Sequence, residues 1–326
     1  MKKLLFKTLF FAMTGFMAAA CQNDIDGADI SGQEIAKNGK KQLVVSADVS
    51  MIAEAETRAL KTGTTFADGD IIGVTLVKNS DAGSYDGQDY NNIPYTLAVT
   101  SGPVYTWSTA ADVLLSSTVG KVTAYYPYNS AAAYDDYTAI PVEAASKTDY
   151  MWGGWSGTVT NASPAATLTM NHALSAVRVN VVRGTYPGTG SMTALSVTSN
   201  RLATAATMNA STGALSSKTG KGGALSWTGT ETLASGVSPA ATTIDLTAVP
   251  ETDASTAITF SVTLDGNSYT ATANFLTGET PITVTAGNIY VFTLTVNGTD
   301  LEVSSVTVTD WTTNNVDLTG ILAPVA

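Results

Sequence analysis

The chain has 326 residues, of which 16 are basic and 27 acidic, so its formal net charge at pH 7 is -11. A protein this acidic lacks the basic patches that displace the counterions of nucleic acid, which excludes nucleic-acid binding. Only 13% of the residues are charged and there is one cysteine, so stability must come from packed cores rather than from an intrachain disulfide.

Residues 1–20 have the features of a secretory signal peptide. Three lysines surround an apolar run over residues 4–16, and alanines occupy positions 18–20. The run is too short to cross a hydrocarbon core of about 30 Å. Cys21 follows directly and is the expected acceptor for bacterial lipidation, although a chance cysteine after an ordinary signal peptide is the alternative. We therefore predict a lipoprotein that is anchored to the cell outer membrane.

A short tether and a first strand follow the predicted lipidation site. Residues 21–41 are polar and begin with several acidic residues, as expected for a flexible linker. From residue 42 the pattern alternates strictly, so that Leu43, Val45, Val49 and Met51 share one face of a half-buried β-strand.

The loop after this strand contains Arg58, the only arginine before Arg178. An isolated arginine in an exposed polar loop is accessible to a trypsin-like protease, which would leave Ala59 as a new N-terminus. An ordinary solvated arginine is the alternative interpretation, and composition alone favours it.

The rest of the chain is β-type. Short segments rich in Val, Ile, Thr and Tyr are separated by Asp-Gly or Asn-Gly turn signals. The predicted strands are Ile71–Val77, Val122–Tyr128, Ala165–Met170, Ala176–Val182, Ala194–Ser199, Thr242–Val249, Ile258–Leu264, Ser268–Phe275 and Tyr290–Val296. Many short strands with frequent turns indicate antiparallel sandwiches. The Gly- and Pro-rich stretch 184–190 predicts a boundary between an N-terminal domain, 59–185, and a C-terminal domain, 190–326.

Catalytic and metal-binding patterns are weak. His172 is the single histidine, and its place before a well-patterned strand favours a structural role. Asp135, Asp136 and Glu143 could be imagined as glycosidase carboxylates, but a loop of this kind more often holds solvated side chains. Residues 81–89 lack the ligand register of a calcium loop and predict a hairpin turn. We predict no enzyme, no cofactor and no metal site.

Several dispersed segments together resemble the fimbrillin (Mfa-like) family, the lipoprotein precursors of bacterial fimbrial subunits. The segments that carry the resemblance, in chain order, are Thr57–Ala59, Phe66–Val74, Tyr125–Tyr128, Asp149–Gly153, His172–Val179, Ala286–Tyr290 and Val306–Trp311. The resemblance implies two transthyretin-like antiparallel β-sandwich domains in tandem and assembly by donor-strand exchange. It also implies that an Arg-specific protease cuts after Arg58 and releases the detachable segment 42–58.

The tail after Trp311 is a candidate donor strand. In residues 312–326, Val316, Leu318 and Leu322 would share one face. The alternative is that this tail forms the last strand of its own domain, and the pattern does not decide between the two.

Two functional hypotheses follow from these patterns. The first is a fimbrial subunit whose partners are other subunits, the protease and, through the lipid, the outer membrane. The second is a surface lipoprotein that does not polymerise and binds glycan or a host ligand.

Overall fold

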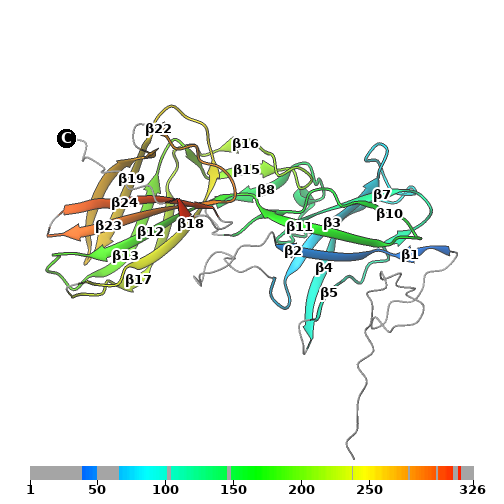
Figure 1. Ribbon diagram of the computed structural model, residues 1–326, viewed down its shortest axis with the longest axis horizontal. Helices are drawn as coiled ribbons and strands as arrows, with labels where there is room; N and C mark the ends of the chain where they lie inside the picture. Colours follow the sequence, from blue (N-terminus) through cyan, green and yellow to red (C-terminus); the bar gives the residue numbers. More distant parts are fainter. Residues whose placement is uncertain are drawn as a thin grey trace, which may run out of the picture. The chain divides into compact units, whose positions relative to one another are not determined.

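The computed structural model describes residues 39–49, 66–100, 104–144, 148–236, 238–277, 280–298, 300–310 and 315–316 (Figure 1). Strands dominate these residues, and the helical element whose bounds lie entirely among them is the 3-10 turn Ala132–Tyr134. The predicted all-β class is therefore confirmed. The division into two tandem domains remains a prediction.

Within the described residues, eight strands form the first sheet, in the order β2-β11-β9-β7-β3-β4-β5, with β10 paired to β7. Their bounds are β2 (Val44–Val49), β3 (Ile71–Lys78), β4 (Tyr90–Thr100), β5 (Val104–Ser108), β7 (Gly120–Tyr126), β9 (Met151–Trp152), β10 (Thr158–Val159) and β11 (Ala165–His172). β11 alternates between buried and exposed residues, as expected for a strand with one face on the core. β3 and β7, in the middle of the sheet, are buried at most positions.

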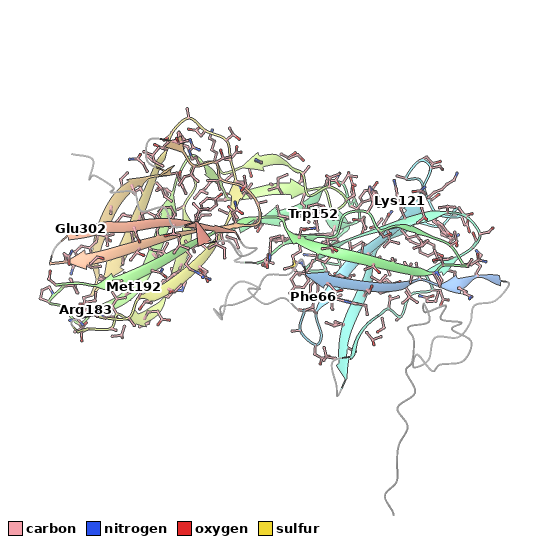
Figure 2. All side chains as sticks on the ribbon, in the orientation of Figure 1. Phe66, Lys121, Trp152, Arg183, Met192 and Glu302 are labelled. Atoms are coloured by element: carbon pink, nitrogen blue, oxygen red, sulfur yellow. The ribbon has the colours of Figure 1, made fainter. Side chains whose placement is uncertain are left out.

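This sheet curls until its first and last strands meet. The indole N–H of Trp107 in β5 donates to the carbonyl of Ala47 in β2 at 3.2 Å. Phe66, labelled in Figure 2, packs edge-on against the same indole with ring centroids 5.1 Å apart. The enclosed core is therefore built from both ends of one sheet, with β2 as part of its wall.

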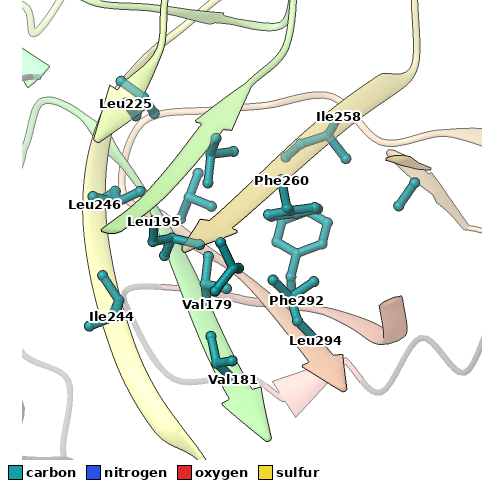
Figure 3. Packing of buried hydrophobic residues seen from close by; sticks show 14 of the residues in the cluster. Val179, Val181, Leu195, Leu225, Ile244, Leu246, Ile258, Phe260, Phe292 and Leu294 are labelled. Carbon is teal, nitrogen blue, oxygen red and sulfur yellow. The ribbon is translucent and has the colours of Figure 1, made fainter. Parts of the chain in front are cut away.

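The second half of the chain forms two sheets that pack face to face. One has the order β14-β18-β12-β23-β24-β25 and the other β17-β13-β19-β20. Their bounds are β12 (Ser175–Arg183), β13 (Ser191–Thr198), β14 (Leu202–Ala203), β17 (Leu225–Thr232), β18 (Thr242–Pro250), β19 (Ala257–Leu264), β20 (Asn267–Asn274), β23 (Asn288–Asn297), β24 (Asp300–Asp310) and β25 (Asn315–Val316). Figure 3 shows side chains from both sheets in one cluster, in which the rings of Phe260 and Phe292 lie 5.0 Å apart.

Pairing crosses the boundary predicted at 184–190. β12 lies before that stretch, yet it pairs with β18 and β23, which lie after it. A small three-stranded sheet also joins β8 (Ile140–Glu143) to β15 (Ala205–Met208), which in turn pairs with β16 (Leu215–Thr219). The remaining short pairs are β1 (Lys41–Gln42) with β6 (Leu114–Leu115) and β21 (Leu276–Thr277) with β22 (Thr280–Pro281).

The predicted Asp-Gly and Asn-Gly turns lie where the sequence indicates. Asp265-Gly266 closes the hairpin between β19 and β20, with φ values of 47° and 80° that favour these residue types. The carboxylate of Asp265 also accepts hydrogen bonds from the hydroxyl of Thr189 and from the backbone N–H groups of Gly190 and Ser191. These contacts, that of Thr189 first, hold the pKa of Asp265 well below its usual range.

Candidate functional site

The candidate site is the place that β2 occupies at the edge of the first sheet. β2 pairs in parallel with β11, from Val44 beside Ala165 to Val49 beside Met170, whereas the other described strand pairs of this sheet are antiparallel. The N–H of Val44 donates to the carbonyl of Pro164 at 2.9 Å and begins this ladder. Figure 1 shows β2 running alongside β11. Among the described strands, β2 therefore pairs with β11, through a parallel ladder on one side.

The residue before β2 and the side chain of Gln42 meet the segment that precedes β6. The N–H of Leu43 donates to the carbonyl of Val113 at 2.9 Å. The carboxamide of Gln42 donates to the carbonyl of Ala111 at 3.0 Å and accepts from the N–H of Val113 at 3.2 Å. Just before β2, the carboxamide of Gln42 thus makes one donor and one acceptor hydrogen bond with backbone groups, as the backbone of a paired strand would.

Two aromatic side chains bind the backbone of the strand on its other side. The hydroxyl of Tyr95 donates to the carbonyl of Leu43 at 3.3 Å, and the indole of Trp107 donates to that of Ala47. Both rings are buried, and burial raises the pKa of Tyr95, so its hydroxyl keeps the proton that it donates. Because the acceptors are backbone carbonyls, these hydrogen bonds do not depend on which side chains the strand carries.

The inward side chains of this segment are fully part of the core. Leu43, Val45 and Ala47 are 1%, 3% and 5% exposed, whereas Ser46 and Asp48 on the opposite face are exposed. Burying one large side chain of this kind contributes about 1.5–3 kcal/mol as an upper estimate. Removal of β2 would therefore uncover an apolar slot and the unpaired edge of β11.

The sequence-predicted site residues fall partly inside the described structure. Leu43 and Val45 lie in the core, and Val49 is the last residue of β2. Val316 lies in β25, where it pairs with Val308 of β24. The other predicted site residues lie outside the described residues: Cys21, Met51, Arg58, Ala59, Leu318 and Leu322.

Sequence reasoning missed Gln42, Tyr95 and Trp107 as parts of this site. β4 was not predicted, because Asn92 and Pro94 lie within it and both residue types are typical of turns. Trp107 stands in a short run, 104–108, in which bulky and small side chains alternate, and that alternation is the signal that could have revealed β5.

The residues considered for catalysis make hydrogen bonds to other groups of the fold. The ring Nδ1 of His172 lies 2.9 Å from Oδ1 of Asp149, and both side chains are buried. Asp135 accepts a hydrogen bond from the amide of the buried Asn92 at 3.2 Å, and Asp136 accepts from Thr138. The loop over residues 81–89 forms turns, as predicted. Among the described residues there is no group of three or more His, Cys, Asp or Glu side chains that could hold a metal ion.

No helix within the described part of the chain is both long enough and apolar enough to cross a bilayer.

Comparison with known proteins gives a family and a fold. A family model described as fimbrillin-like matches residues 57–311. No curated protein matches the chain. A proposed cell adhesion protein from Bacteroides uniformis is similar in structure, with 23% identity and a TM-score of 0.56 over 84% of this chain and 100% of that one. Another, from Bacteroides ovatus, has 17% identity and a TM-score of 0.55 over 84% and 99%. At these identities the structural likeness establishes the fold.

Proposed function

Because this chain belongs to the fimbrillin-like family, we propose that it is a structural subunit of a bacterial surface fimbria. It is exported as a lipoprotein through Cys21 and held at the outer membrane. An Arg-specific protease cuts after Arg58, and the shortened chain then polymerises with other subunits by donor-strand exchange.

The observation that carries this proposal is the way in which β2 is built into the sheet. Its inward side chains fill the core, yet its ladder to β11 is parallel and ends after six residue pairs. Parallel pairing is slightly less stable per residue than antiparallel pairing. A second strand with the same alternation can replace β2, since it restores both the burial and the backbone hydrogen bonds of the edge.

The order of the chain supports a single processing step. Strands β1 and β2 precede Arg58, and every other described strand follows it. One cut in residues 50–65 therefore leaves the first strand attached to the rest of the fold by noncovalent contacts alone. Head-to-tail replacement of such a strand does not close on itself, so it produces a filament.

The second candidate function is ligand binding without polymerisation. A cavity of about 330 Å³ has Tyr90, Tyr137 and three acidic residues, Asp89, Asp135 and Asp136, among the residues that line it. Aromatic rings beside carboxylates are a combination that can bind sugars. This cavity lies in the first half of the chain and uses none of the residues that hold β2.

Limited proteolysis of the purified precursor separates the two functions. An Arg-specific protease should give a product that begins at Ala59 and SDS-resistant ladders, and Arg58→Gln should abolish both. A product that is fully cut yet remains monomeric contradicts assembly by strand exchange. Saturable binding of a glycan by the monomer, lost in Tyr137→Ala, would instead support the second function.

A further inference from the structure

Residues 315–322 of the C-terminal tail repeat the side-chain pattern of residues 42–49, the segment that fills the slot. Each tail residue matches the residue whose number is lower by 273. We propose that residues 315–322 of a second copy take the places of residues 42–49 in one register, parallel to β11, with Gly320 where Ala47 lies. This inference rests on the proposed function, with the tail as the candidate donor strand, and what it adds is the register in which the tail enters the slot.

The first match is a carboxamide. Gln42 bridges Ala111 and Val113 through its amide side chain, donating to one and accepting from the other. Asn315 carries the same group on a side chain that is one methylene shorter. The entrance of the slot thus offers both a donor site and an acceptor site for this residue type.

The second match is the sequence of large and small apolar side chains. The inward residues Leu43 and Val45 are large, and the next one, Ala47, is small. In the tail the corresponding residues are Val316, Leu318 and Gly320, and Leu322 follows at the position of Val49. A small residue is needed at the third place because the buried Trp107 contacts the backbone there, and a closely packed core resists extra volume.

The third match is a hydroxyl on the outward face. The hydroxyl of Ser46 donates to that of Thr167 in β11 at 3.2 Å. The proposed register places Thr319 at this position, so the hydroxyl pair can form again.

Neighbouring registers lose these matches. A shift by two residues in either direction places Leu318 or Leu322 on the small site of Ala47 and removes the hydroxyl opposite Thr167. Reversing the strand with Gly320 kept in place brings Pro324 to the position of Leu43. Proline has no N–H to donate to the carbonyl of Val113. In the proposed register Pro324 falls two residues beyond the end of the ladder.

Tyr95 and Trp107 fix the axial position of the incoming strand. Their acceptors are the carbonyls of Leu43, just before β2, and of Ala47 within it, four residues apart. In the tail these would be the carbonyls of Val316 and Gly320. Since the two donors contact backbone atoms, they remain usable after the exchange. In the described part of the tail, Asn315 and Val316 pair with Thr309 and Val308 of β24, so these two pairs have to open before donation.

Disulfide trapping tests the register. The cut chain contains no cysteine, because Cys21 precedes Arg58. A cut acceptor carrying Thr167→Cys is mixed with donor chains carrying Asp317→Cys, Thr319→Cys or Ile321→Cys, one at a time. Adjacent strands lie about 4.8 Å apart, which suits the Cα separation of a disulfide. We expect Thr319→Cys to form a mixed disulfide with the acceptor at least ten times faster than the other two, and the uncut acceptor to form none.

A second acceptor tests the direction of the strand. With Ala165→Cys, a parallel strand joins to Asp317→Cys, whereas a reversed strand joins to Ile321→Cys.

Each remaining outcome decides the inference. Preferential trapping of Asp317→Cys or Ile321→Cys by Thr167→Cys overturns the register but keeps strand exchange. SDS-resistant ladders without trapping at any of the three positions show that another segment is the donor. Absence of ladders from fully cut wild-type protein overturns the proposed function as well.

Discussion

Truncating the inward side chain of Leu43 tests two claims about residues 43–49. The first is that they are part of the core of the precursor, and the second is that they are released when the protein assembles. Leu43 is 1% exposed and packs among large apolar residues of the first sheet. Leu→Ala at such a site costs about 2–5 kcal/mol, because it loses the transfer free energy and leaves a cavity. We expect Leu43→Ala to lower the free energy of unfolding of the uncut precursor by this amount, measured by urea denaturation with tryptophan fluorescence.

The same substitution should have no effect on the assembled protein. After cutting and exchange Leu43 is absent from the filament, so filaments made from Leu43→Ala precursor should unfold like those made from wild type. Asp48→Ala is the matched control, since Asp48 is exposed on the opposite face of β2 and its replacement should change stability by no more than about 0.5 kcal/mol. A precursor that tolerates Leu43→Ala refutes the packing of β2, and filaments destabilised to the same extent refute its removal.

Three further predictions concern processing, the backbone contacts and acid stability. Arg58→Gln should leave the precursor uncut and monomeric on gel filtration after protease treatment, and ladders formed by this variant would show that cutting is unnecessary. Tyr95→Phe retains the ring but loses the hydrogen bond to the carbonyl of Leu43, so urea unfolding of the precursor should show a loss of about 1 kcal/mol; an unchanged midpoint contradicts that bond. The pKa of Asp265 is lowered in the folded state, so its contribution to stability is present above its ordinary value of 3.8 and is lost as the pH falls below that value. Asp265→Asn should therefore weaken the acid-induced decrease of the urea midpoint, and an identical decrease in both proteins would contradict this role.

Local sequence patterns predicted the hairpins in which a turn signal lies between two alternating segments. Alternation over Tyr290–Val296 into Asn297-Gly298 indicated a hairpin, and the structure pairs Asn297 with Asp300 between β23 and β24. The same reasoning located β19 and β20 on either side of Asp265-Gly266. In both places the turn residue and the alternation act over a few residues, so a single sequence is sufficient.

The pairing of strands that lie far apart in the chain could not be predicted from such local patterns. β2 lies beside β11 although their residues are about 120 positions apart, and nothing in either segment specifies a parallel partner. β4 was missed because Asn92 and Pro94 are typical of turns, and Asn92 indeed has a φ of 52° although it lies within the strand. The hydrogen bonds of Asn92 with Tyr125 and Asp135 hold it there, and these partners lie 33 and 43 residues away.

The inward alternation of residues 43–51 was visible in the sequence, but the groups that hold the strand were not. Tyr95 and Trp107 donate hydrogen bonds to backbone carbonyls. No side chain of the strand is needed as their partner, so the sequence of the strand does not indicate them. Their role depends on the curl of the sheet, which brings β5 against β2. Such curvature arises from the twist of many strands together and cannot be assigned to one segment.

A fibre made in this way has a polarity, because each copy donates its tail and accepts another tail at a different part of its surface. The parallel ladder between β2 and β11 also fixes the direction in which each tail enters, so each added copy faces the same way as the one before it. One terminus of the fibre then presents a vacant socket, while the opposite terminus presents a spare tail. These two termini are chemically different, so elongation, capping and attachment to the cell can each be confined to one of them.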